Sequence, residues 1–160
     1  MEPRMIELPH FFVMGIAVYG DGMSGLFPMA WDMYLRMKGE IGLKNPNVRY
    51  GVEYYTEEFE KEHKWFYMAC GEVEDLSTIP SSMVAKVIPA HKYAVFTSKG
   101  LLDALHKTFQ YAYHEWLPKS RYEIADWFDF ELYDERFRGM NNPIGEIDIY
   151  MPVRKMGAGG

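Results

Sequence analysis

The stretch Trp127-Phe-Asp-Phe-Glu-Leu-Tyr133 alternates apolar and acidic side chains in the manner of a β-strand. Because successive side chains of a strand point to opposite faces, Asp129, Glu131 and Tyr133 share one face and Phe130 and Leu132 share the other. An acid on the wet surface of a sheet is the plainer interpretation of Glu131. The neighbouring aromatic residues favour another, because ring faces and a carboxylate together can receive a bulky organic cation.

This stretch has a faint counterpart 80 residues earlier in the chain. Tyr50-Gly-Val-Glu-Tyr54 aligns with Phe130-Glu-Leu-Tyr-Asp134, and further out Pro9 and Gly20 align with Pro89 and Gly100. The match indicates a tandem duplication. Gly51 then corresponds to Glu131, which has two interpretations. Either the missing side chain leaves volume for a ligand, or Gly51 marks a β-bulge or a close backbone approach.

The order of the expected elements is consistent with this duplication. Three-to-four spacing of apolar residues predicts two helices, and apolar extended segments predict the strands between them. We expect strands at 5–20 (broken near Pro9), 49–55, 64–74, 83–97, 126–134 and 146–153, with helices at 26–43 and 101–117, the latter closed by Pro118. The charged segment 56–63 is expected to be a loop.

These elements predict an α+β fold of two tandem βαββ repeats related by pseudo-twofold symmetry. We expect an antiparallel sheet with both helices on one face and a ligand groove between the halves on the other. Glu53 falls on the same strand face as Gly51, so a second acid in that groove is an open question.

Composition narrows the class of protein. The chain has 160 residues, 48% of them hydrophobic, and a formal charge of −6, which disfavours a nucleic-acid-binding surface. We expect a single domain over residues 1–155 and a disordered tail over 156–160. The chain shows no signal peptide, and the apolar run at 11–19 is too short to cross a membrane, so we expect a soluble, cytoplasmic protein.

Several chemistries lack their sequence signatures. The five histidines show no paired ligand spacing, and Cys70 is the only cysteine, so we expect no metal site and no cofactor. Cys70 is interpreted as a buried small hydrophobic residue. The glycines at 20, 22 and 25 match GxGxxG by letter, but the expected antiparallel pairing does not suit a dinucleotide fold.

Six segments, in order, carry a family resemblance over residues 5–153. They are Tyr50-Gly-Val52, Phe66-Tyr-Met-Ala-Cys-Gly-Glu-Val73, Ile88-Pro-Ala-His-Lys-Tyr-Ala-Val-Phe-Thr97, Glu115-Trp-Leu-Pro-Lys-Ser-Arg-Tyr-Glu123, Asp129-Phe-Glu-Leu-Tyr133 and Ile147-Asp-Ile-Tyr-Met-Pro152. Together they resemble the GyrI-like small-molecule-binding domain, which also forms the effector-binding part of AraC-type and MerR-type multidrug-responsive regulators.

The resemblance implies roles for particular residues. Glu131 would be the acid that contacts cationic ligands. Trp31, Tyr50 and Phe96 would be aromatic walls of the pocket. The resemblance assigns the same role to Tyr67 and Trp116 on weaker sequence matches. Tyr133 shares the strand face of Glu131. For each aromatic residue, plain core packing is the alternative. The family often carries a histidine where this chain has Thr97-Ser-Lys99.

Three functions remain. The first is a stand-alone binding protein for bulky amphipathic organic cations, with Glu131 as the counter-charge. The second is an enzyme of the kind ascribed to some GyrI-like proteins, a hydrolase of strained electrophiles with Glu131 as general base and Tyr50 or Tyr67 as hydrogen-bond donor. The third is an interaction module for a separate protein partner. The chain shows no helix-turn-helix, so we expect no direct nucleic-acid binding.

Overall fold

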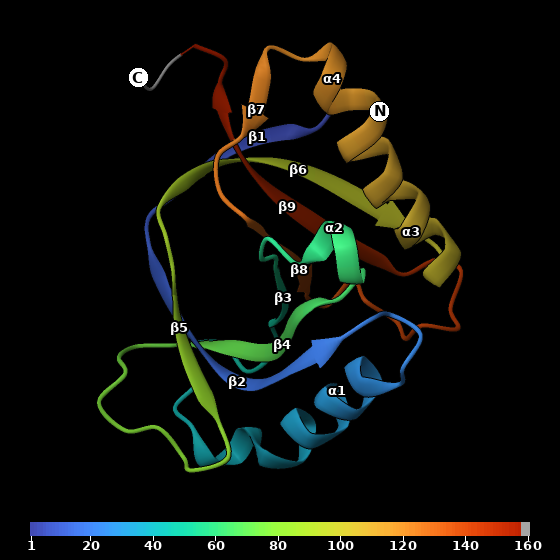
Figure 1. Ribbon diagram of the computed structural model, residues 1–160. Helices are drawn as coiled ribbons and strands as arrows, with labels where there is room; N and C mark the ends of the chain where they lie inside the picture. The colour runs from blue at the N-terminus through green and yellow to red at the C-terminus, as the bar shows by residue number, and fades with distance from the viewer. Residues whose placement is uncertain (158–160) are drawn as a thin grey trace. The chain divides into compact units, whose positions relative to one another are not determined.

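The computed structural model describes residues 1–157, which divide into two compact units (Figure 1). One unit comprises residues 9–90 and is called the central unit here; the other comprises residues 1–8 and the described residues from 91 onward, and is called the terminal unit. Most of the predicted tail at 156–160 lies outside the described residues, and Met156 and Gly157 form a turn.

The central unit is a four-stranded antiparallel sheet with one main helix. Its strands are β2 (Phe11–Gly20), β3 (Arg49–Tyr54), β4 (Trp65–Val73) and β5 (Val84–Ile88), in the spatial order β3-β4-β2-β5. Helix α1 (Leu26–Met37) lies along β2 and β4 (Figure 1). It buries Ala30 and Tyr34, one turn apart, against Met14, Ile16 and Ala69.

The terminal unit is built in the same way. Strands β1 (Arg4–Leu8), β6 (His91–Lys99), β8 (Phe128–Tyr133) and β9 (Glu146–Lys155) pair in the order β1-β6-β9-β8, and the short β7 (Tyr122–Ile124) also pairs with β9. Helix α3 (Leu102–Tyr111) packs on β6. It continues through a π-helical turn (Ala112–Trp116) into α4 (Leu117–Lys119).

The pairing register of one unit recurs in the other at an offset of 80 residues. Three examples are Tyr50–Cys70 with Phe130–Tyr150, Phe12–Val73 with Lys92–Val153, and Phe11–Ile88 with His91–Leu8. The chain therefore has the predicted α+β class with antiparallel pairing, and strand–helix–strand–strand order occurs in each unit. The pseudo-twofold relation between the units stays a prediction.

Local differences from the predicted elements have local causes. The first helix ends at Met37 instead of residue 43, with a 3₁₀ turn over Lys38–Glu40 that contains Gly39. Pro118 does not close the second helix but lies in its last turn, after the π-helical turn that precedes it. The predicted loop at 56–63 contains a single helical turn, α2 (Phe59–Glu62), and β7 was not predicted.

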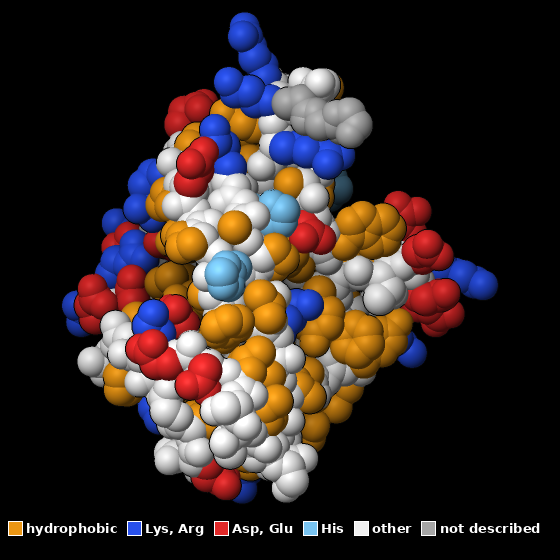
Figure 2. Space-filling view, turned by 90° about the vertical axis from the view of Figure 1, so that its left-hand side faces the viewer, with side chains coloured by type: hydrophobic (Ala, Val, Ile, Leu, Met, Phe, Trp, Pro, Cys, Tyr) orange, Lys and Arg blue, Asp and Glu red, His pale blue; other side chains and the backbone are white. Residues whose placement is uncertain are grey.

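The described helices and the surface add two observations. None of the helices in residues 1–157 is long and apolar enough to cross a membrane. On the face shown in Figure 2, acidic and basic side chains are interspersed, so the net charge of −6 is not gathered there into one patch of a single sign.

A substitution at Gly15 tests the pairing of β2 with β4, because Gly15 lies opposite Cys70 in that pairing. A Cβ at this position would lie 2.0 Å from the Ala69 carbonyl oxygen and 2.7 Å from the Cys70 Cα, and neither atom can move without disturbing the sheet. We expect Gly15→Ala to lower the free energy of unfolding by about 3 kcal/mol in a urea titration.

Gly39→Ala is the matched control, because a Cβ at Gly39 meets open space. It should change the free energy of unfolding by less than about 0.5 kcal/mol. Equal effects of the two substitutions would contradict the register described for β2 and β4.

Candidate functional site

Glu131 lies in the middle of β8 and is almost completely buried. Its side chain is 5% exposed, and the Tyr133 hydroxyl donates a hydrogen bond to its Oε1 at 2.8 Å. The predicted alternation is confirmed, because Glu131 pairs with Ile149 while Phe130 pairs with Tyr150. The interpretation of Glu131 as an acid on a wet sheet surface is wrong, since both faces of β8 are covered.

The register also decides which face of the terminal sheet carries the acid. Glu131 pairs with Ile149, and Ile149 pairs with Phe96, so the three side chains share a face. Phe96 packs edge-on against Tyr111 at the end of α3 and against Trp116 of the π-helical turn, with 6.2 and 5.4 Å between the ring centroids. Glu131 therefore lies on the helix-bearing face, which corrects our expectation that the acid and the helix take opposite faces.

A second buried acid lies on the same face. Asp129, two residues before Glu131, is 0% exposed and accepts a 2.6 Å hydrogen bond from the Tyr113 hydroxyl on the π-helical turn. The strand alternation placed Asp129 beside Glu131, but nothing in the sequence showed that Tyr113 would reach it. Each acid of this face thus receives a tyrosine hydroxyl.

Two aromatic residues of the terminal unit that were predicted as pocket walls, Phe96 and Trp116, pack at least partly in its core. Phe96 is 1% exposed and belongs to the apolar cluster with Ala94, Ala112 and Met151. Trp116 packs on that cluster, and its ring also lies against Tyr122 with the centroids 6.0 Å apart. Packing between sheet and helix therefore accounts for the buried side of both residues.

In the central unit, Trp31 and Tyr67 are brought together. The Trp31 indole N–H donates to the Tyr67 hydroxyl at 2.8 Å, and Phe27 stacks on the Tyr67 ring at 4.5 Å. Arg49 lies over the Trp31 ring with 5.6 Å from its guanidinium carbon to the ring centroid. Phe27 was not predicted, although its position one helical turn before Trp31 was a signal that could have found it.

Glu53 and Gly51 lie on the α1-bearing face of the central sheet. Glu53 pairs with Tyr67 and is 6% exposed, and Gly51 pairs with Ala69. The pairing of β3 with β4 runs through Gly51 without interruption, which excludes a bulge between these two strands. Whether Glu53 adds a second acid to a ligand groove stays open as a prediction.

Tyr50 does not join the other predicted aromatic residues of its unit. It pairs with Cys70, so its side chain takes the face opposite to Tyr67, and its ring lies 5.5 Å from that of Phe11. Cys70 is fully buried, and burial raises the pKa of its thiol, which matches a packed hydrophobic residue and not a nucleophile. Within residues 1–157 no three His, Cys, Asp or Glu side chains gather as metal ligands.

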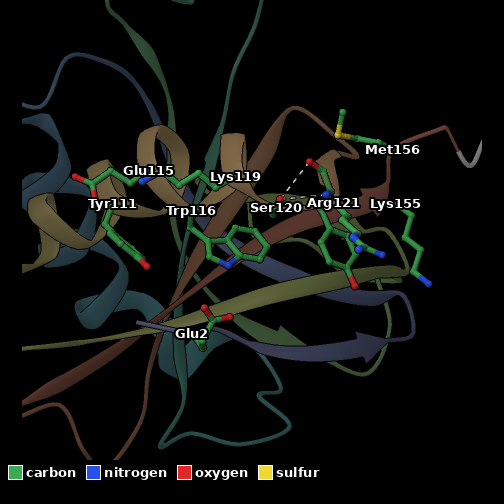
Figure 3. Close-up of a pocket in the computed structure, with 10 residues that line it drawn as sticks. Glu2, Tyr111, Glu115, Trp116, Lys119, Ser120, Arg121, Lys155 and Met156 are labelled. Carbon is green, nitrogen blue, oxygen red and sulfur yellow. Dashed lines mark hydrogen bonds between the residues drawn. The ribbon is translucent and has the colours of Figure 1, made fainter.

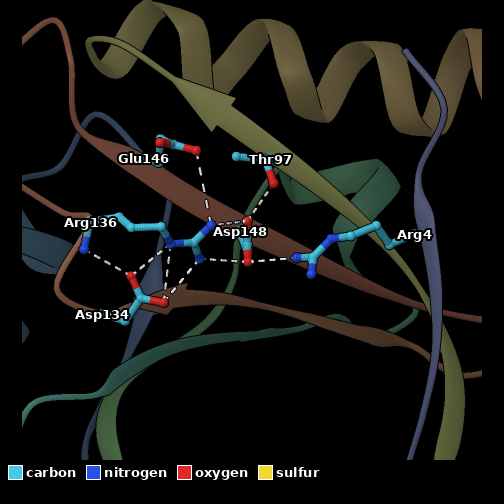
Figure 4. A network of polar contacts seen from close by, with 6 residues as sticks. All are labelled: Arg4, Thr97, Asp134, Arg136, Glu146 and Asp148. Carbon is cyan, nitrogen blue, oxygen red and sulfur yellow. Dashed lines mark hydrogen bonds and ion pairs between the residues drawn. The ribbon is translucent and has the colours of Figure 1, made fainter.

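Asp148 is a buried acid of a different kind, on the other face of the terminal sheet (Figure 4). It accepts hydrogen bonds from Arg4 at 2.9 Å, Arg136 at 2.7 Å and the Thr97 hydroxyl at 2.6 Å. Arg136 also binds Asp134 at 2.9 Å. This cluster joins β1, β6 and β9 to the segment after β8, so it has a structural role.

The fold is of the α+β class with buried acids on a helix-bearing sheet face, and comparison with known proteins identifies the family. The chain belongs to the GyrI-like small-molecule-binding domain family, whose model matches residues 1–154. The resemblance seen in the sequence is thereby confirmed.

One relative in sequence and two solved structures are similar to this chain. The transcriptional regulator BrlR of Pseudomonas aeruginosa is 34% identical over 154 residues, which is 96% of this chain and 56% of BrlR. SAV2435, solved with tetraphenylphosphonium bound, has a TM-score of 0.71 at 18% identity and covers 96% of this chain and 94% of its own. EcmrR in a complex with DNA has a TM-score of 0.77 at 18% identity, over 97% of this chain and 58% of its own.

The Asp134–Arg136 pair predicts an acid dependence of stability. Burial alone would raise the pKa of Asp134, but the hydrogen bonds and charge of Arg136 lower it by more, and the pKa falls below its ordinary value of 3.8. The pair therefore stabilises the folded state above that value and loses its contribution as the pH falls through the folded-state pKa. The free energy of unfolding should therefore fall as the pH is lowered through the ordinary value of 3.8 and below it.

Arg136→Met tests this origin. It should lower the free energy of unfolding by about 2–3 kcal/mol at pH 7 and flatten the acid dependence, because the carboxylates lose their cation. Arg138→Met, at an exposed position two residues later, is the control and should leave both unchanged. An equally steep acid dependence in Arg136→Met would count against the pair as its cause.

Proposed function

We propose that this domain binds bulky amphipathic organic cations and that Glu131 supplies the counter-charge. The observation that carries the proposal is the burial of Glu131 on the helix-bearing face of the terminal sheet, with the Tyr133 hydroxyl on its carboxylate. A carboxylate removed from water attracts a cation more strongly than an exposed one, because the surrounding dielectric constant is lower. Tyr133 is a neutral donor, so its hydrogen bond orients the acid without cancelling its charge.

Aromatic residues support the same ligand class. Ring faces attract cations and offer flat apolar area, and each cation–ring contact contributes about 0.5–2 kcal/mol. In the terminal unit, the ring of Phe137 lies edge-on against the ring of Tyr133, the residue that bonds Glu131, with 4.9 Å between the ring centroids. Micromolar affinity requires about 8 kcal/mol, which a few rings, apolar burial and one counter-charge can supply.

The comparisons support the class of ligand. SAV2435 shares the fold and was solved with tetraphenylphosphonium, a bulky aromatic cation. Flat apolar walls with one counter-charge constrain a ligand loosely, so we propose broad specificity among cations. This chain spans 56% of the length of BrlR, and a regulatory role of that kind would require further protein.

Replacing Glu131 with Gln tests the counter-charge. We expect Glu131→Gln to weaken tetraphenylphosphonium at least about tenfold in isothermal titration calorimetry, because a tenfold change corresponds to about 1.4 kcal/mol of lost attraction. Triphenylphosphine oxide, a neutral analogue, should bind the variant and the native protein alike.

Asp103→Asn is the control, since Asp103 is a well-exposed acid on α3 of the same unit. It should leave both affinities unchanged. Equal loss of the cationic and the neutral compound in Glu131→Gln would exclude the counter-charge role, and absence of tetraphenylphosphonium binding to the native protein would refute the proposed function.

A hydrolase is the second candidate, favoured by the contact of a tyrosine hydroxyl with the buried acid. Glu131 would act as general base toward water, and Tyr133 would hold its carboxylate in position. The hydrogen-bond donor to the leaving oxygen stays the predicted Tyr50 or Tyr67. Saturable turnover of a strained electrophile such as an epoxide, lost in Glu131→Gln, would establish the enzyme; stoichiometric protection without product would exclude it.

A further inference from the structure

The terminal unit contains a pocket that neither Glu131 nor Tyr133 lines. It has a volume of about 560 Å³ and opens between the π-helical turn, α4, β7 and the end of β9 (Figure 3). This volume lies within the range of pockets that hold small organic ligands. Trp116 and Tyr122 line it together with Lys119, Arg121 and Lys155.

Two neighbouring aromatic rings, those of Trp116 and Tyr122, line this pocket. The rings of Trp116 and Tyr122 are nearly parallel, with 19° between their planes and 6.0 Å between their centroids. Trp116 is held in place by its edge-on contact with the buried Phe96, so its orientation is fixed before a ligand arrives. A preorganised pair of rings favours a flat aromatic ligand.

Positive charge gathers at one end of the pocket. Tyr122 pairs directly with Lys155 across β7 and β9, and the Met156 N–H donates to the Arg121 carbonyl oxygen at 2.9 Å. Arg121 directly precedes β7 and lies opposite Met156, the residue after Lys155, and Figure 3 shows the Arg121 and Lys155 side chains at the same end of the pocket. Within residues 1–157, neither side chain forms an ion pair, and both are exposed.

The remaining charges limit what the pocket accepts. Glu115 lies at the end opposite to Arg121 and Lys155 in Figure 3, and Glu2 also lines the pocket. With Lys119 counted, three basic and two acidic side chains line it, in a chain whose net charge is −6. A ligand with one negative charge at the Arg121 end is attracted, whereas a second negative charge would meet Glu115 or Glu2.

We propose that this pocket is a second ligand site, specific for planar aromatic monoanions such as aryl carboxylates and sulfonates. The aromatic ring packs on Trp116 and Tyr122, and the anionic group binds Arg121 and Lys155. Arg121 can offer two parallel N–H donors to such a group. This site prefers the charge opposite to that proposed for Glu131, so the two assignments are independent.

The test uses naphthalene-2-sulfonate as the probe and 2-naphthalenemethanol as its neutral counterpart. Binding is followed by ¹H–¹⁵N NMR titration, in which the four tryptophan indole N–H signals report on location. We expect saturable binding of the sulfonate with a Kd below about 1 mM, shifts of the Trp116 indole signal, and weakening as salt is added.

Variants separate this site from the rest of the molecule. Arg121→Gln combined with Lys155→Gln should weaken the sulfonate at least about tenfold and leave the neutral compound unchanged, because both side chains are exposed and the fold does not depend on them. Lys107→Gln, at an exposed lysine on α3, is the matched control. Glu131→Gln should leave sulfonate binding intact.

Two results would overturn the site. One is a lack of saturation of the native protein at millimolar sulfonate. The other is equal affinity for the sulfonate in the native protein and in the double variant, which would place binding elsewhere. Neither result bears on cation binding at Glu131, which is tested separately with tetraphenylphosphonium.

Discussion

The structure depends on how its buried carboxylates are compensated for the loss of their hydration. Four acids, Glu53, Asp129, Glu131 and Asp148, are buried among the described residues. An ionised carboxylate in a protein interior is tolerated only when hydrogen bonds or opposite charges compensate it. The groups that donate hydrogen bonds to these acids differ from one acid to the next.

Asp148 is compensated by two guanidinium groups and a hydroxyl, so its charge is consumed within the fold. Asp129 and Glu131 each receive a tyrosine hydroxyl, from Tyr113 and Tyr133. These two acids lie on the sheet face opposite to that of Asp148, so buried acids on the two faces of one sheet receive different hydrogen-bond donors.

The secondary structure was largely predictable because it depends on local pattern. The alternation around Glu131, the break near Pro9 and both helices follow from side-chain spacing and from proline chemistry. The 80-residue offset was visible in the sequence only as scattered prolines and glycines. The strand pairs show the same offset, because Tyr50–Cys70 and Phe130–Tyr150 differ by 80 residues at each position.

The sequence by itself determined the class of fold, the family and the strand face of Glu131, because periodicity and motif order are properties of the chain alone. The tertiary structure decided which helix covers that face, that Tyr113 reaches Asp129, that Tyr50 points away from Tyr67, and that Arg121 and Lys155 line the same pocket as Trp116. Each of these depends on the register between strands distant in sequence. Register is fixed by packing across the sheet and cannot be read from the spacing within any one segment.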